Sequence, residues 1–556
     1  MSRRNTARPK GKDQSMATSH AISSSLSEMA ASPRTAKHAH RTSYDGEDDV
    51  ELSLLGEEER RQAANGLDVE DQRGSQPHSL SNEDKRAMVL LCILYLIQGV
   101  PLGLALGSVP FILREQLSYS QLGTFALSGY PYSLKLLWSP IVDSLFFPSI
   151  GRRKSWIIPM QFIIGTLMLY ISLNVQVLMD DAAHHVTQLT FLFTSLVFFS
   201  ATQDIAVDGW ALNLLSPESL PYASTCQTIG LNTGFFASFT VFLAFNSQEF
   251  ATKWGVPHLT LSAYLKFWCA MSYAVSLWLL FVKRERKEAL SDIDLSITTV
   301  YKQIWAICKL RHVQLLILVH LVAKIGFAAN DAATSLKMVE KGFLREDLAI
   351  AVLIDFPFQI VGGWLAAKWS RGEYPLRPWL IAFWPRLSLG LVATLIVYWF
   401  PRPPITMGFF VFLIVHTIMS SFASTVQFSG ISAFHARISD PLIGGTYMTL
   451  LNTFTNLGGT FPKWFVLKGI DLFTEATCKV KDGSTTLNTQ VSECVSEAGK
   501  EACKSAGGEC HIETDGYYTV SGICMLLGVA FLVLYIIPTA RKLQSLPTSA
   551  WRVKMS

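Results

Sequence analysis

The sequence predicts an all-α membrane protein with twelve transmembrane helices in two six-helix halves. Three observations lead to this fold class: the uneven distribution of charge, the spacing of the apolar runs, and one basic segment that divides those runs equally. Residues 1–86 contain 28 of the 90 charged side chains, whereas the other 470 residues share 62. A chain with so few charged side chains over 470 residues would not stay soluble. The composition therefore excludes an ordinary cytosolic enzyme, a nucleic-acid-binding protein and a small secreted disulfide scaffold.

Residues 1–86 are rich in Ser, Arg, Asp and Glu and nearly lack aromatic side chains. Such a segment cannot bury a core, so we expect a disordered cytosolic tail. No apolar stretch follows the N-terminal charges, and a signal peptide is therefore not expected.

Apolar runs of about 20 residues follow the tail, which is the length that crosses a bilayer as a helix. Only helices satisfy their backbone polar groups within one span, so each run is predicted to be helical. The twelve runs lie near 87–111, 119–143, 156–177, 188–213, 223–246, 261–282, 312–336, 347–369, 378–400, 405–434, 442–466 and 518–538.

Basic residues set the expected orientation. With the N-terminus inside, the inner loops and the C-terminal tail hold 17 Lys and Arg, and the short outer loops hold six. The positive-inside rule then places both termini in the cytosol. The basic cytosolic linker 283–311 separates the half 87–282 from the half 312–538, and 539–556 forms a cytosolic tail. Two six-helix halves joined in this way are the layout of the major facilitator superfamily.

The loop after the second run has a Pro-containing stretch that ends at Asp143, followed by Gly151, Arg152, Arg153 and Lys154. It resembles the loop motif of the facilitator superfamily. We expect Asp143 to pair with cationic residues on the cytosolic side in one transport state and to separate in the other, which makes these residues gating candidates. The spacing is longer than in the usual motif, so the partners stay open. The alternative is simple retention of positive charge on the cytosolic side.

Ionisable residues inside the runs are costly in a membrane and point to function. Asp204 and Asp208 are four residues apart and share one helix face. They could form a proton- or cation-sensitive switch, or they could pair with basic side chains of neighbouring helices to fix the packing; both interpretations stay open. Lys324 and Asp331, seven residues apart, are also expected to share a face. Both this cluster and the pair Asp204 and Asp208 are expected to face the central cavity.

Buried cations are the more informative group. Lys135, Lys324, Arg386 and Lys463 predict a cationic interior, which favours an anionic substrate. No Walker loop, dinucleotide fingerprint or metal-spaced His/Cys set is present. We therefore expect no catalytic residues, no cofactor, no metal site and no nucleotide-hydrolysing pump.

The large outer loop, residues 467–517, carries four of the nine cysteines. An even set on the oxidising side predicts two disulfides, with three connectivities open. The alternative is four free or metal-binding thiols. These cysteines are Cys478, Cys494, Cys503 and Cys510.

Several stretches together are similar to the acetyl-coenzyme A transporter family, and the resemblance covers nearly all of residues 87–540. The most specific stretch runs over 439–452 and continues to 456–459. The others are 96–103, 133–140, 151–156, 201–210 and 323–327.

The resemblance implies a multi-pass protein of the endoplasmic-reticulum membrane. It would carry cytosolic acetyl-CoA into the lumen in exchange for CoA, so that lumenal enzymes can acetylate proteins and glycolipids. CoA carries a charge of roughly −4, which several Lys and Arg could offset. Its adenine could stack on Tyr130, Tyr132 or Trp210. The expected partners are acetyl-CoA and CoA as transported molecules and the lipid bilayer; nucleic acid is not expected, and a homodimer stays open.

The candidate substrate-binding residues combine polar side chains of the runs with two Asn of the most specific stretch. They are Gln98, Tyr130, Tyr132, Lys135, Gln203, Asp204, Asp208, Trp210, Lys324, Asn330, Asp331, Arg386, Asn452 and Asn456.

Two alternatives remain. The same scaffold could carry another anionic metabolite or a muropeptide-like substrate. A membrane acetyltransferase would need a histidine with a positioned acid, and the helix-face neighbour of His320 is Lys324, a poor partner for a general base.

Overall fold

The computed structural model describes residues 81–552 except 115, 217–218, 220–221, 286–296, 371–373, 403, 440–443, 481–493, 496 and 506. The predicted disordered tail lies outside the described residues except for its last six positions, where helix α2 already begins at Asn82.

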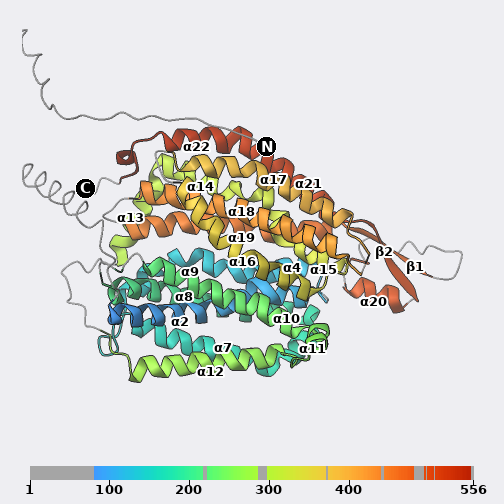
Figure 1. Cartoon of the computed structure of the whole chain (residues 1–556), viewed down its shortest axis with the longest axis horizontal. Helices are drawn as coiled ribbons and strands as arrows, with labels where there is room; N and C mark the ends of the chain where they lie inside the picture. Colours follow the sequence, from blue (N-terminus) through green and yellow to red (C-terminus); the bar gives the residue numbers. More distant parts are fainter. Residues whose placement is uncertain are drawn as a thin grey trace, which may run out of the picture. The chain divides into compact units, whose positions relative to one another are not determined.

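The first half is a bundle of helices in which α2 packs on α9, and α7 packs on both α8 and α12 (Figure 1). Its elements are α2 (Asn82–Gly103), η1 (Leu104–Ser108), α3 (Val109–Leu113), α4 (Tyr119–Ala126), η2 (Leu127–Gly129), α5 (Tyr130–Leu134), η3 (Lys135–Leu137), α6 (Ser139–Ser144), α7 (Lys154–Asp180), α8 (Ala182–Leu214), α9 (Tyr222–Phe236), η4 (Ala237–Val241), α10 (Phe242–Asn246), α11 (Gln248–Trp254) and α12 (Leu261–Phe281).

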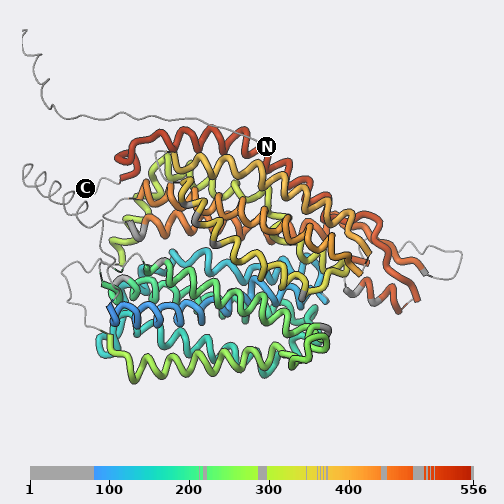
Figure 2. Tube along the Cα trace, in the orientation of Figure 1, coloured from blue at the N-terminus to red at the C-terminus, as the bar shows by residue number. Residues whose placement is uncertain are grey.

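The second half is a second bundle, in which α18 packs on α16 and α17, and α14 packs on α19, while α19 also packs on α4 of the first half. Figure 2 shows the yellow-to-red trace of this half grouped apart from the blue-to-green trace of the first. Its elements are α13 (Ile297–Lys309), α14 (Arg311–Ala323), η5 (Ile325–Phe327), η6 (Asn330–Thr334), α15 (Ser335–Glu340), α16 (Arg345–Trp369), α17 (Leu376–Tyr398), α18 (Met407–Ile438), α19 (Gly444–Leu472), β1 (Glu475–Val480), α20 (Glu497–Ser505), β2 (Gly508–Thr514), α21 (Gly516–Phe531), η7 (Leu532–Ile536), α22 (Ile537–Gln544) and η8 (Thr548–Trp551).

Eight helical segments within the described part are long and apolar enough to cross a bilayer, and a ninth passes if α13 and α14, bent by 83°, count as one. The other three predicted runs are helical but do not qualify. The run 119–143 is divided into the short pieces α4 to α6. Run 347–369 falls in α16, and run 442–466 lies mostly in α19, whose sequence is rich in Thr, Asn and Gly. The fold is all-α and membrane-embedded, and the count of twelve stays a prediction.

Two of the predicted runs change helix type where their polar residues lie. The second run has 3-10 turns at η2 and η3, on either side of α5, and the seventh has a 3-10 turn at η5 and a π-helical turn at η6. Such turns re-aim side chains and are frequent at functional sites. Lys324 and Asp331 are therefore not one face of a regular helix, because η5 lies between them.

The C-terminal segment is more ordered than a free tail. Helix α22 ends at Gln544, and Trp551 in η8 is fully buried. Its ring lies 4.7 Å from that of His312 and 5.7 Å from that of Phe434, measured between ring centroids. Within the described residues, the predicted tail thus begins as a helix, and its Trp551 packs against α14 and α18.

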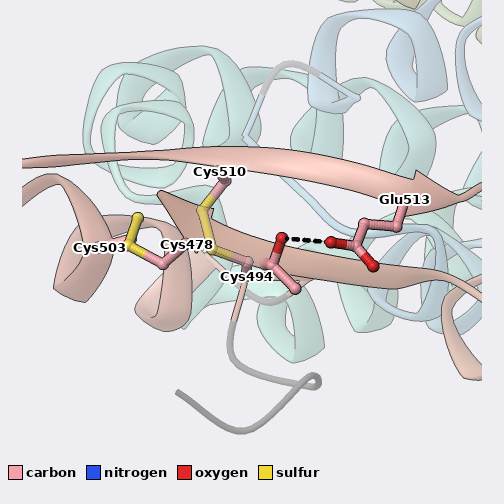
Figure 3. The surroundings of a disulfide bond; sticks show 6 residues. Cys478, Cys494, Cys503, Cys510 and Glu513 are labelled. Carbon is pink, nitrogen blue, oxygen red and sulfur yellow. Dashed lines mark hydrogen bonds between the residues drawn. A yellow bond between two sulfur atoms is a disulfide. The ribbon is translucent and has the colours of Figure 1, made fainter. Parts of the chain in front are cut away.

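The outer loop forms an antiparallel hairpin of β1 and β2 with helix α20. The two predicted disulfides are present, and they join Cys478 to Cys503 and Cys494 to Cys510. Figure 3 shows both bonds beside the strands, where Glu513 of β2 accepts a hydrogen bond of 3.0 Å from Thr477 of β1.

Candidate functional site: a cationic central cavity

A central cavity of about 730 Å³ is lined by residues of both halves. Most of its wall is apolar. In the described part of the chain its charged lining consists of three cations and one carboxylate, which are Lys324, Arg386, Lys463 and Asp331. The formal charge of the wall is therefore +2. A volume in this range is typical of small-molecule and cofactor sites.

Arg386 of α17 is held in a fixed orientation. Its Nη2 donates to Asp331 Oδ2 over 3.1 Å, and its Nη1 donates to Gln427 Oε1 over 2.6 Å. The guanidinium carbon lies 4.2 Å from the centroid of the Phe327 ring. Because these contacts use two of the five N–H donors, the remaining N–H groups are available for an anionic group such as phosphate.

Lys324 and Lys463 differ from Arg386 because neither forms an ion pair with any residue that the structure describes. An ammonium without a carboxylate partner is costly in an apolar wall. The two lysines therefore give the cavity an excess of positive charge that a bound anion would offset.

Two adjacent glycines of α19 determine where Lys324 lies. A Cβ at Gly458 would come within 2.1 Å of the carbonyl oxygen of His320, so α14 and α19 approach too closely there for any side chain. A Cβ at Gly459 would lie 3.1 Å from Lys324 Nζ. The Gly-Gly step thus leaves room for the ammonium beside α19.

The charged residues of the first-half cluster are not in the cavity lining, although Lys135 Nζ lies 5.4 Å from the ring centroid of Tyr132, which does line it. Lys135 Nζ is 2.5 Å from Asp204 Oδ2 and 3.5 Å from Asp208 Oδ2. Asp208 Oδ1 also accepts hydrogen bonds of 2.8 Å from Tyr95 and Gln227. Lys135 is therefore neutralised by two carboxylates and adds no net positive charge. Such pairing with a basic side chain of a neighbouring helix is what the packing interpretation of Asp204 and Asp208 expects. Their role as a proton- or cation-sensitive switch stays a prediction.

The cavity brings together five of the fourteen candidate residues. Whether any candidate contacts substrate stays a prediction. Those that line the cavity are Tyr132, Lys324, Asp331, Arg386 and Asn456, and those outside its lining are Gln98, Tyr130, Lys135, Gln203, Asp204, Asp208, Trp210, Asn330 and Asn452.

The residues outside the lining have other surroundings. Asn330 donates to the carbonyl of Gly390 over 2.9 Å, so it supports the π-helical turn. Gln98, Gln203 and Trp210 are buried, and Tyr130 donates to a backbone carbonyl of α19 over 3.4 Å. The two buried Gln amides have no hydrogen-bond partner in the described part of the chain, and we have no physical account of them.

Sequence reasoning did not place Gln427 or Thr460 in the site, and it named Lys463 only as part of the cationic interior. Gln427 orients Arg386, and Thr460 shares a hydrogen bond of 2.9 Å with Ser133 across the two halves. Their common signal is a polar side chain in an otherwise apolar run, but neutral residues of this kind are frequent in membrane helices.

The loop that is predicted to be cytosolic, residues 139–154, provides the partners that the spacing left open. Arg153 Nη1 lies 2.5 Å from Asp143 Oδ1, and Arg152 donates to the backbone carbonyl of Asp143. Glu285 accepts from the backbone N–H groups of Arg153 and Lys154 over 2.9 and 3.0 Å, and so caps α7. The loop therefore joins the start of α7 to the end of α12, both in the first half. The gating role stays a prediction.

The face that is predicted to be the outer one carries ion pairs that bridge the halves. Arg114 and the hydroxyl of Tyr119 in the first half contact Glu340 Oε2 of the second over 2.7 and 2.8 Å. Glu340 also pairs with Lys337 over 2.9 Å. Burial alone would raise the pKa of Glu340, but the charges of Lys337 and Arg114 outweigh it and lower that pKa to about 2. Asp471 of α19 accepts from the backbone N–H of Tyr119 over 3.2 Å and so caps α4.

Comparison with known sequences gives three related groups. The profile of the family described as acetyl-coenzyme A transporter 1 matches residues 87–295, 287–375 and 372–553. An uncharacterized protein of Schizosaccharomyces pombe is 41% identical over 490 residues, which cover 86% of this chain and 91% of that protein. An uncharacterized membrane protein of Saccharomyces cerevisiae is 38% identical over 556 residues, with 85% and 98% covered. The anhydromuropeptide permease of Escherichia coli is 29% identical over 160 residues, which cover 28% of this chain and 30% of the permease.

Solved structures support the architecture. A bacterial homologue of the human lysosomal transporter Spinster superposes with a TM-score of 0.55 at 15% identity, covering 85% of this chain and 100% of the homologue. At this identity the likeness shows the fold alone, which is that of the major facilitator superfamily.

Proposed function

Because this chain belongs to the acetyl-coenzyme A transporter 1 family, we propose that it carries acetyl-CoA across a membrane through the central cavity, in exchange for CoA. The family and the fold together make it a membrane transporter. The cargo, the exchange and the direction, from the cytosol into the endoplasmic-reticulum lumen, are the proposal. Its product would supply lumenal acetylation of proteins and glycolipids.

The observation that carries the proposal is the charge of the cavity wall. Three cations face one carboxylate, and that carboxylate is paired with Arg386. A polyanion of roughly −4 such as CoA would offset the excess charge that Lys324 and Lys463 leave. The proposal assigns phosphate groups to these lysines and to the remaining N–H groups of the Arg386 guanidinium.

Alternating access requires that the cavity open to each side in turn. The outer contacts of Arg114 and Glu340 join the two halves, so they must separate when the cavity opens outward. The proposal therefore makes them an outer gate.

The test is uptake of radiolabelled acetyl-CoA by proteoliposomes that contain the purified chain. We expect uptake to rise severalfold when CoA is present inside, because exchange provides a loaded return step. Absence of uptake under both conditions would reject acetyl-CoA as the cargo, and uptake independent of internal CoA would reject the exchange.

A second cargo class follows from the similarity to the anhydromuropeptide permease over 28% of this chain. Competition separates the two. We expect unlabelled CoA to suppress uptake and an anhydromuropeptide to leave it unchanged.

A further inference from the structure

A pair of buried histidines beside the cavity forms a short hydrogen-bonded chain. The Nε2 atoms of His320 and His435 lie 2.9 Å apart, and the two side chains are 2% and 0% exposed. His435 Nδ1 is 3.2 Å from Asn452 Oδ1, and His320 Nδ1 is 3.3 Å from Thr455 Oγ1. The Thr455 hydroxyl also lies 3.0 Å from the carbonyl oxygen of Leu451. The chain thus links α14, α18 and α19.

With both histidines neutral, this hydrogen-bonded chain is one proton short of making all its hydrogen bonds. Asn452 Oδ1 only accepts, so His435 Nδ1 carries a proton, and a neutral His435 then accepts at Nε2 from His320. A neutral His320 has no proton left for Nδ1. The Thr455 hydroxyl has a single proton for two acceptors, the Leu451 carbonyl and His320 Nδ1. All four hydrogen bonds are made only when His320 carries a second proton at Nδ1.

The charges around the pair oppose that second proton when the cavity is unoccupied. Lys324 lies one turn after His320 on the same helix, and α18 contributes His435 and Arg437. The other helices packed on α14 contribute mostly cations, which are Lys302 and Lys309 of α13, Arg541 and Lys542 of α22, and Lys463 and Lys468 of α19.

Carboxylates are distant from the pair. In the described part of the chain, Asp471 is the one acidic residue on these helices, and at 1.5 Å per residue it lies about 24 Å along α19 from Thr455. Asp331 of the cavity wall is already paired with Arg386. On α16, which packs on α18, Asp355 accepts from Ser421, and Ser421 lies about 21 Å along α18 from His435. Among the described residues, therefore, no carboxylate holds a proton on His320.

A bound anion would reverse this balance, because His320 and Thr455 both line the cavity. We propose that His320 and His435 form a proton site that fills when the anionic substrate occupies the cavity; the proposal rests on the function proposed above. Substrate and proton stabilise each other's binding, since coupling between two sites is reciprocal.

This coupling has a consequence for transport. Acetyl-CoA and CoA carry the same phosphate groups, so each would bring one proton, and one-for-one exchange moves no net proton. Net entry of either molecule, without exchange, carries a proton with it. A pH gradient should therefore drive net uptake and leave exchange unchanged.

The direct test is titration calorimetry of the purified full chain with dephospho-CoA, which lacks the 3′-phosphate that itself titrates near pH 6. Measurement at pH 7.5 in two buffers of different ionisation enthalpy gives the number of protons taken up on binding. We expect uptake approaching one proton in the wild type, and Kd rising by up to about tenfold per pH unit above the site's titration range. The variants His320→Gln and His435→Gln should still bind dephospho-CoA, but without taking up a proton.

The matched control is His416→Gln, a histidine of the same half that contacts the backbone carbonyl of Leu389 over 2.9 Å and lies outside the cavity lining. The His416→Gln variant should still take up a proton when it binds dephospho-CoA. If the Gln variants do not fold, Thr455→Val leaves both imidazoles in place. It removes the hydroxyl that would accept a hydrogen bond from protonated His320 Nδ1, so it should reduce the proton uptake.

The outcomes separate this proposal from the one on which it rests. Absence of dephospho-CoA binding by the wild type would contradict the proposed function. Binding without proton uptake would overturn the proton site alone. Proton uptake that persists in both histidine variants would assign the proton to Lys324 and would also overturn the histidine proton site.

Discussion

Each half of the chain has a buried cationic cluster, and the two clusters are paired in opposite ways. In the first half, one lysine, Lys135, faces two carboxylates, Asp204 and Asp208. In the second half, Lys324, Lys463 and Arg386 share one carboxylate, Asp331. The first cluster is complete without a ligand, and the second has a charge excess that faces a cavity.

The difference teaches that a buried cation is a weak sign of an anion site until its partners are known. A lysine that is paired with carboxylates fixes helix packing. A lysine without a partner beside a cavity has a desolvation cost that a ligand can offset. Substitutions in the two clusters should therefore affect different measurements.

The largest effect on stability is expected at Lys135. Lys135→Ala leaves Asp204 and Asp208 adjacent and unpaired inside the protein, which should cost about 3–5 kcal/mol. The thermal unfolding temperature of the detergent-solubilised chain should fall, and Asp204→Asn added to the same chain should restore part of it. An unchanged unfolding temperature together with lost CoA binding would reverse the assignment of the two clusters.

The largest effect on transport is expected at the unpaired lysines. Lys324→Ala and Lys463→Ala should each reduce acetyl-CoA uptake at least tenfold and leave the unfolding temperature unchanged or raised, because an uncompensated buried charge is removed. Lys468→Ala is the matched control, since Lys468 lies on the same helix outside the cavity lining. Full uptake by both cavity variants would contradict the site.

A smaller effect is expected when the charge is kept and the shape is changed. Arg386→Lys retains one cation but loses the planar fork that contacts Gln427 and Asp331 together. The KM for acetyl-CoA uptake should rise several-fold, with a smaller change in the maximal rate. A variant indistinguishable from wild type in KM would mean that the guanidinium geometry is not used.

The smallest effect concerns the outer ion pair. The pKa of Glu340 is lowered to about 2 from an ordinary 4.5. The lowered pKa gives stability that is complete above about pH 4.5 and is lost as the pH falls toward 2. Glu340→Gln should therefore lower the unfolding temperature by the same small amount at pH 5.5 and at pH 8. A difference between these two values would show that Glu340 titrates in the neutral range.

The apolar runs predicted the helices well, because burial in lipid imposes length and composition on every span. The existence of two disulfides followed from four cysteines in one outer loop. Their pairing could not be predicted, since it depends on how α20 lies against the hairpin.

The pairing of the buried charges could not be predicted for a similar reason. Lys135 and Asp204 are 69 residues apart and meet because their helices pack together. The seventh run reads as a regular helix, yet the turns η5 and η6 change the direction of Lys324 and Asp331. Sequence periodicity gives faces within one helix, whereas the charge balance of a cavity depends on contacts between helices.

The disulfide-bonded hairpin also has a mechanical consequence. β1 begins three residues after α19 ends, and β2 ends two residues before α21 begins. Paired strands lie about 4.8 Å apart. One disulfide joins β1 to α20, and the other joins the segment before α20 to β2, so the hairpin and α20 form one cross-linked unit. The end of α19 and the start of α21 are thus held together and should move as one rigid unit. Any movement of α19 that carries Lys463 and the Gly458–Gly459 step must carry α21 with it.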